Sequence, residues 1–120
     1  MALMNIVTLG STGLQNWLVQ RLTAVILVLY ILFLSGYIVH SYIMDVPIDF
    51  FRWQALFHHP LMQLATLITL LSVSFHAYLG LLIIIQDYIH STVIHLMVTS
   101  TVLLVIFSYF IWGISILWHI

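Results

Sequence analysis

One histidine, His76, stands deep inside a long apolar stretch of the sequence. It lies about nine residues before Ile85, the end of a run without Asp, Glu, Lys or Arg that begins at Leu61. An ionisable side chain at that depth in a membrane span is costly and usually marks a function. Haem iron accepts imidazole nitrogen, so His76 is a candidate axial ligand of a b-type haem. The alternative is a neutral histidine that hydrogen-bonds a neighbouring helix.

Small residues stand one helical turn on either side of His76. Ser72 precedes it and Gly80 follows it, so the three residues share one face if the run is helical. A flat macrocycle could lie against the bare backbone at Gly80. Small residues also allow two helices to pack closely, so the spacing is compatible with both interpretations of His76.

The other histidines lie at the ends of apolar runs or in loops, where we expect interfacial anchoring or loop hydrogen bonds. They are His40, His58, His59, His90, His95 and His119. Adjacent side chains such as His58 and His59 point in different directions, and no carboxylate cluster accompanies them, so no metal site is expected there. If a haem has two histidine ligands, the second must come from another polypeptide. A hetero-oligomer with haem at the subunit boundary is the natural interpretation.

Asp87 and Tyr88 follow the same apolar run. On a helix Asp87 lies roughly 20° from His76 in projection and roughly 16 Å further along the axis. The phenolic hydroxyl of Tyr88 is a good donor to a carbonyl such as that of a quinone. Asp87 could support a hydrogen-bond network or proton transfer. An interfacial tyrosine beside a helix-ending aspartate is the alternative.

The composition places these residues in a membrane protein. Of 120 residues, 64% are hydrophobic and 4% are charged, which excludes a soluble globular domain. Three runs reach the roughly 20 apolar residues that a span requires. They cover residues 21–42, 61–85 and 93–118, and all five charged side chains fall at or outside their ends. The sequence therefore predicts an all-α integral membrane protein of three transmembrane helices in one domain, residues 1–120.

Several other function classes are excluded. The net charge of −1 offers no basic patch for nucleic acid, and the absence of cysteine excludes thiol catalysis and iron–sulfur ligation in this chain. No charge at mid-membrane depth supports a channel or transporter. Thr101, Ser108 and Ser115 recur every seven residues, which favours close helix packing rather than a pore.

The segments outside the spans are short. Residues 10–13 (Gly-Ser-Thr-Gly) predict a loop, and residues 14–20 predict a short amphipathic lead into the first span. The longest connection, residues 43–60, is too short for a nucleotide-binding domain. Arg21 abuts the first span and Arg52 follows it, so the positive-inside rule is nearly balanced; a cytoplasmic N-terminus is the orientation we expect.

Two stretches resemble a known family. His76-Ala77-Tyr78-Leu79-Gly80, followed by Gln86-Asp87-Tyr88, resembles the H-A-x-x-G-x(6)-D-Y motif of the small hydrophobic membrane anchor of succinate dehydrogenase. Residues 19–24, Val-Gln-Arg-Leu-Thr-Ala, resemble the entry to the first span of that family. Length and the number of spans agree over essentially the whole chain. The motif in the second span is the specific part of the resemblance.

The resemblance implies a role in the bacterial inner membrane. Three helices would form half of a heterodimeric anchor bundle with a partner anchor subunit, and the pair would hold the iron–sulfur and flavoprotein subunits at the membrane. It implies that His76 ligates a haem b shared between the anchors and that Arg21 faces a haem propionate. It further implies that Tyr88 hydrogen-bonds ubiquinone, with Asp87 supporting that site. Catalysis of succinate oxidation would belong to the other subunits.

Two alternatives remain open. A non-redox structural or assembly subunit would use His76 for packing, and it would lack the absorbance of a low-spin haem. The anchor of a related fumarate reductase would share the architecture, because the sequence does not fix the direction of electron flow.

Overall fold

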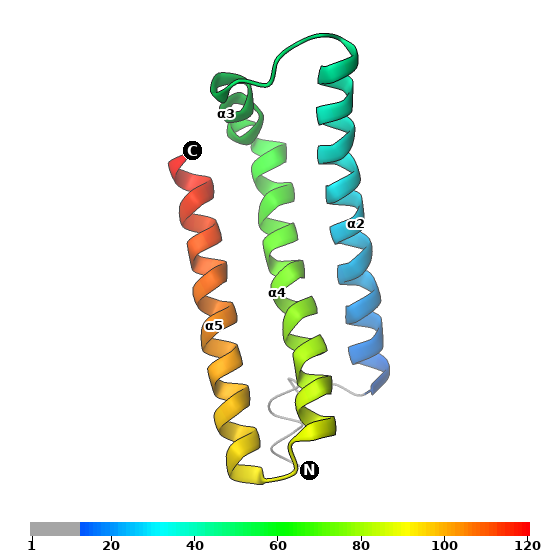
Figure 1. Cartoon of the computed structure of the whole chain (residues 1–120), viewed down its shortest axis with the longest axis vertical. Coiled ribbons are helices and arrows are strands. Elements are labelled where there is room, and N and C mark those ends of the chain that lie inside the picture. The colour runs from blue at the N-terminus through cyan, green and yellow to red at the C-terminus, as the bar shows by residue number, and fades with distance from the viewer. Residues whose placement is uncertain (1–12) are drawn as a thin grey trace.

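The computed structural model describes residues 13–120, and these residues form helices and connecting loops only. The helices are α2 (Gly13–Ile43), α3 (Phe50–His58), α4 (Pro60–Tyr88) and α5 (Thr92–His119). All but α3 are long and apolar enough to cross a membrane. This confirms the predicted all-α fold with three candidate transmembrane helices, which Figure 1 shows side by side.

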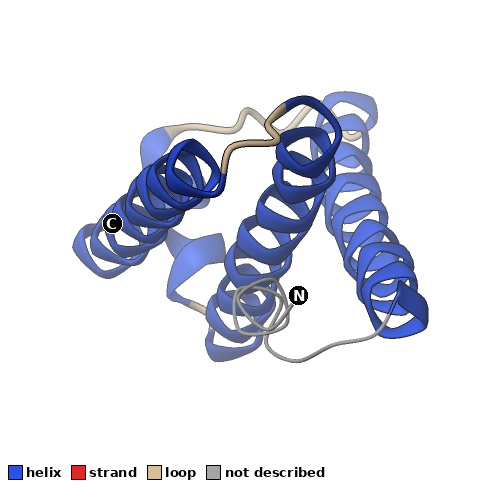
Figure 2. Ribbon diagram, turned by 90° about the horizontal axis from the view of Figure 1, so that it is seen from below, coloured by secondary structure: helices blue, strands red, loops and turns tan. Residues whose placement is uncertain are grey.

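The central helix is α4, and α2 and α5 pack on its two sides (Figures 1 and 2). The three helices alternate in direction, and together with α3 they fill an elongated body of 57 × 27 × 23 Å. In the apolar window of α4, 28% of residues are buried, against 6% in α2 and in α5. The outer helices therefore offer most of their apolar side chains to lipid or to other subunits.

The first long helix begins earlier than the predicted span. Gly13, which we expected in a loop, is the first residue of α2, and Leu14 to Gln20 continue the same helix into the span. Residues 14–21 contain neither proline nor glycine, so no helix-stop signal interrupts the backbone hydrogen bonds there. The rest of the predicted loop, residues 10–12, lies outside the described residues.

The connection at residues 43–60 contains a helix that was not predicted from the sequence. Asp49 caps α3, because its Oδ1 atom accepts a hydrogen bond of 2.8 Å from the backbone N–H of Arg52. Pro60 then starts α4 after a single residue, His59, whose Nδ1 atom accepts from the backbone N–H of Leu61 at 3.2 Å. Proline is favoured at the first position of a helix, so α4 starts directly after this one-residue break.

α3 lies over one end of the bundle and is held there by packing and by a hydrogen bond. Phe57 of α3 forms a buried cluster with Met62 of α4 and Leu117 of α5. The Nε2 atom of Gln54 donates to the backbone carbonyl of Ile120 at 2.6 Å. α3 therefore joins the start of α4 to the end of α5.

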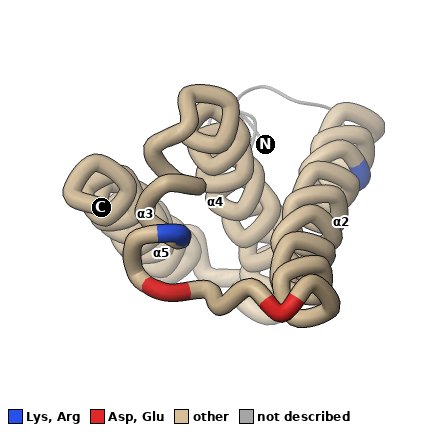
Figure 3. Tube along the Cα trace, turned by 90° about the horizontal axis from the view of Figure 1, so that it is seen from above, with Lys and Arg blue, Asp and Glu red and all other residues tan. Residues whose placement is uncertain are grey.

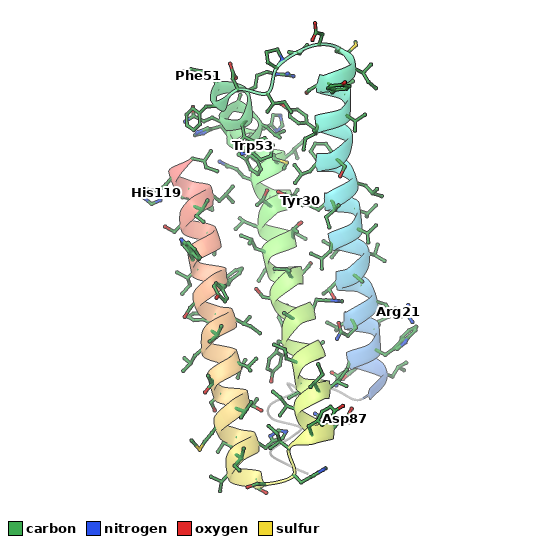
Figure 4. All side chains as sticks on the ribbon, viewed as in Figure 1. Arg21, Tyr30, Phe51, Trp53, Asp87 and His119 are labelled. Carbon is green, nitrogen blue, oxygen red and sulfur yellow. The ribbon has the colours of Figure 1, made fainter. Side chains whose placement is uncertain are left out.

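The two ends of the bundle differ in their charged residues. The end that carries α3 also carries Asp45 and Asp49 in the loop before α3 and Arg52 in α3 itself. Figure 3, the view onto this end, shows acidic and basic positions along this loop and the start of α3. The opposite end holds the start of α2, the end of α4 and the short turn into α5 (Figure 1). Arg21 and Asp87 lie toward that second end (Figure 4).

Candidate functional site

His76 lies in the body of α4 and faces α2. Its ring Nδ1 atom lies 3.2 Å from the Oγ1 atom of Thr23, which is 53 positions away in the sequence. The imidazole is half-buried, and this is its one hydrogen bond among the described residues. A structural histidine would make such a contact, and a metal-ligating histidine also needs one, because its second nitrogen is usually fixed by a hydrogen bond.

Thr23 is itself fixed within α2. Its side chain is 6% exposed, and Oγ1 lies 2.7 Å from the carbonyl oxygen of Val19 and 3.1 Å from that of Gln20. A threonine hydroxyl commonly bonds back to the carbonyl four residues earlier in a helix. The hydroxyl that meets His76 therefore belongs to a rigid part of the neighbouring helix.

Gln20 extends this group by one turn. Its Nε2 atom lies 3.7 Å from where a Cβ atom on Gly80 would stand, so the amide covers the glycine that follows His76. The Oε1 atom of Gln20 is buried and has no hydrogen-bond partner within residues 13–120. Buried polar atoms are rarely left unpaired, so we expect the side-chain carbonyl of Gln20 to accept a hydrogen bond from a group outside residues 13–120. The α2–α4 face around His76 therefore carries polar groups from both helices.

Thr23 and Gln20 were not predicted as members of the site. The sequence contains a pattern that could have pointed to them. Both are polar residues at the entry to an apolar span, and a spacing of three places them on one face of the helix. What the sequence did not provide was the register of α2 against α4. Only that register brings Thr23, rather than another polar residue, to His76.

Asp87 and Tyr88 lie at the end of α4, beyond the deep part of the span. Both side chains are exposed, Tyr88 to 80%. Figure 4 shows Asp87 on the side of α4 that faces the start of α2. His76 faces α2 as well, so both side chains lie on the α2 side of α4. The pair offers a phenol and a carboxyl group at the membrane surface, separate from the deep imidazole.

Arg21 lies on a different side of α2. Figure 4 shows it on the side turned away from α4, and its guanidinium carbon stands 5.4 Å from the ring centroid of Trp17. Two residues correspond to roughly 200° of rotation, so Arg21 and Thr23 point to nearly opposite sides of the helix. The contact between Arg21 and a haem propionate stays a prediction.

One of the six histidines expected at interfaces or in loops differs from the others. His95, in the first turn of α5, is buried, and its Nε2 atom has no hydrogen-bond partner among the described residues. Thr99 follows one turn later, also buried and with its hydroxyl unpaired in the same part of the chain. The remaining five, His40, His58, His59, His90 and His119, are exposed. His95 therefore differs from those five in burial, and the interfacial role expected of all six histidines stays a prediction.

Comparison with known proteins gives the family. Over 106 residues, 88% of this chain and 89% of the relative, the sequence is 35% identical to the succinate dehydrogenase hydrophobic membrane anchor subunit of Coxiella burnetii. The subunit of the same name from Rickettsia bellii is 34% identical over 80 residues, which are 67% of this chain and 61% of the relative. No family model matches the sequence. The chain belongs to the family of succinate dehydrogenase hydrophobic membrane anchor subunits, and in that complex it is a non-catalytic anchor.

Proposed function

We propose that this anchor shares a b-type haem with a second anchor subunit and that His76 supplies one of the two axial ligands. One observation carries the proposal. The ring of His76 is held at Nδ1 by Thr23, and among the described residues nothing bonds its Nε2 atom. An imidazole anchored at one nitrogen and open at the other is the arrangement that metal-ligating histidines adopt.

The second axial ligand would come from the partner anchor. Among the described residues no other histidine lies at the depth of His76, since His95 lies in the first turn of α5 and the remainder lie near helix ends or in loops. When bound, the haem would supply a one-electron redox centre whose potential depends on its axial ligands and their hydrogen bonds. Expressed alone, the chain should not retain stoichiometric six-coordinate haem, whereas co-expression with the partner should restore it.

Three further residues complete the proposed haem environment. Thr23 would hold the His76 ring, and the buried carbonyl of Gln20 would accept a donor from the assembled complex. Arg21 would pair with a propionate, which requires its guanidinium to leave Trp17 and turn around α2. An arginine is always charged and matches the geometry of a carboxylate, which supports this assignment.

A ubiquinone site at the end of α4 forms the second part of the proposal. Tyr88 would donate its phenolic hydrogen to a quinone carbonyl, and Asp87 would support the hydrogen-bond network around it. Both side chains are exposed in the isolated chain, as residues that meet a substrate between subunits must be. This end of the bundle would face the cytoplasm, together with the start of α2, in the bacterial inner membrane.

The same end would dock the water-soluble subunits. An iron–sulfur subunit and a flavoprotein subunit would sit on this side, so that electrons from succinate reach quinone beside Tyr88. The named relatives are anchors of succinate dehydrogenase, which supports such partners for this chain.

A spectrum of the purified complex tests the haem assignment. The reduced-minus-oxidised absorbance should show the α band of low-spin b-type haem. In the variant His76→Ala that band should weaken, or the spin state or potential should change. His90→Ala is the matched control. His90 is an exposed histidine in the loop just after α4, outside the body of the helix that holds His76. If the wild-type complex lacks haem, or if His76→Ala leaves spectrum and potential unchanged, His76 is a packing residue. If the wild-type complex contains no haem, the contact with Thr23 supports the alternative, a non-redox structural subunit.

A further inference from the structure

We infer that Thr23 is a positioning residue of the haem site, because it accepts the Nδ1 hydrogen of His76 and thereby presents Nε2 to the iron. The inference rests on the proposed role of His76. In this arrangement a residue of α2, Thr23, sets the tautomer of a haem ligand that stands on α4, His76.

The Thr23 hydroxyl has a single proton to give. A hydroxyl carries one hydrogen and two lone pairs, so it can donate once and accept twice. The shortest contact of Oγ1 is the one of 2.7 Å to the carbonyl of Val19, with the carbonyl of Gln20 at 3.1 Å. Carbonyl oxygens only accept hydrogen bonds. The proton of Thr23 is therefore committed to its own helix, and the lone pairs of Oγ1 remain for His76.

The tautomer of the imidazole follows from that commitment. A neutral imidazole carries a hydrogen on one nitrogen and a lone pair on the other. Because Oγ1 can only accept at the 3.2 Å contact, the hydrogen of His76 must be on Nδ1. The lone pair is then on Nε2, the nitrogen that would bind iron. The opposite tautomer would place two lone pairs against each other, so the contact selects between the two forms.

The surroundings make Thr23 hard to replace. The residue is 6% exposed, so water has little access to take over the acceptor role. It lies well inside a helix of 31 residues, where backbone hydrogen bonds fix its position. The ring of His76 is consequently held by a rigid neighbouring helix rather than by a mobile loop, and its plane is defined along with its tautomer.

The reduction potential of a bound haem would depend on this hydrogen bond. An Nδ1–H group that donates to an acceptor makes the imidazole a more basic ligand. A more basic axial ligand favours ferric over ferrous iron and so lowers the reduction potential. Loss of the acceptor should raise the potential, by up to about 59 mV if the ferrous-to-ferric ratio at a fixed potential changes by up to about tenfold.

Three variants of the assembled complex test the inference. Thr23→Val keeps the branched shape and removes the acceptor, whereas Thr23→Ser keeps the oxygen. The matched control is Thr66→Val, which removes a hydroxyl from the same α2–α4 interface at Tyr30, ten residues from His76. Each complex is assayed for the ratio of haem to flavin, for the midpoint potential in a redox titration, and for the low-spin electron paramagnetic resonance signal of the ferric haem.

The expected pattern is specific to the site. Thr23→Val should raise the midpoint potential and alter the low-spin resonance, Thr23→Ser should return both toward wild type, and Thr66→Val should change neither. If Thr23→Val retains haem with the potential and resonance of the wild type, the inference is wrong although His76 remains a ligand. The same holds if Thr66→Val shifts them equally. If the wild-type complex contains no b-type haem, the proposed function and this inference both fail.

Discussion

Tyr30 of α2 and Thr66 of α4 meet through their hydroxyl oxygens at 2.8 Å, across 36 positions of sequence. The Thr66 hydroxyl donates to the carbonyl of Met62 at 2.8 Å, so Tyr30 is the donor in the pair. This contact and the one between Thr23 and His76 lie seven residues apart on α2. Each of these two separated polar contacts favours the observed register of α2 against α4, which a uniformly apolar interface would leave loosely defined.

The first prediction concerns this hydroxyl pair. Tyr30→Phe should lower the free energy of unfolding by roughly 0.6 kcal/mol, the average for hydrogen bonds between membrane helices. Thermal unfolding of the purified complex in detergent measures the change. Combining Tyr30→Phe with Thr66→Val in a double-mutant cycle isolates the pair, and a coupling energy of zero would mean that the two hydroxyls do not stabilise each other.

A second prediction contrasts two glycines. A Cβ atom on Gly113 of α5 would lie 2.8 Å from Cδ2 of Leu70 on α4, whereas on Gly80 the nearest atom would be at 3.7 Å. Alanine favours helix over glycine by about 1 kcal/mol, and overpacking costs about 1–3 kcal/mol. Gly80→Ala should therefore be at least as stable as wild type, and Gly113→Ala should be less stable than Gly80→Ala by about 1–3 kcal/mol. Equal melting temperatures for the two variants would show that Leu70 moves aside without cost.

A third prediction concerns the start of α3. Asp49→Ala removes the acceptor for the backbone N–H of Arg52 and should cost about 0.5–2 kcal/mol of stability. Asp49→Asn keeps a capping oxygen and should behave like the wild type. Because α3 lies at the end of the bundle away from Asp87 and Tyr88, both variants should keep normal quinone reduction once assembled. Equal destabilisation by alanine and asparagine would instead indicate that the charge of Asp49 matters.

The spans were predictable because a membrane imposes a strong rule. Every backbone group must be bonded within its own helix, so three long uncharged apolar runs can only become three helices. Helix α3 was not predicted, because no such rule applies to a short segment outside the spans. Its stability depends on Phe57 packing against Met62 and Leu117, residues of two other helices, and a stretch of nine residues has little helical tendency alone.

The candidate site was predictable along one helix but not between helices. The angle per residue of a helix is enough to place His76 and Asp87 on one face from the sequence alone. The same arithmetic separates Arg21 from Thr23, although these two residues are close in sequence. Contacts between helices depend on register, and apolar side chains of similar size encode register weakly. His95 illustrates this, since its position near a helix end gave no sign that its side chain is buried.

The last prediction separates the proposed quinone site from the proposed haem site. Tyr88 lies twelve residues beyond His76, roughly 18 Å along the helix axis, and is 80% exposed. Tyr88→Phe keeps the ring and its place at the membrane surface but deletes the phenolic donor. A quinone carbonyl gains negative charge during reduction, so a donor stabilises that change more than the neutral ground state.

Ubiquinone reduction by Tyr88→Phe should fall roughly tenfold or more, as it does when a donor to a developing oxyanion is removed. The haem spectrum should be unchanged, and so should succinate oxidation with a soluble dye, because that chemistry belongs to the other subunits. All three are measured on one assembled preparation, so that poor assembly is not mistaken for a defect of the site. Tyr109→Phe is the matched control, since this exposed tyrosine lies on α5 away from the end of α4. Normal quinone reduction in Tyr88→Phe would make Tyr88 an interfacial anchor, and the haem assignment of His76 would stand independently of that result.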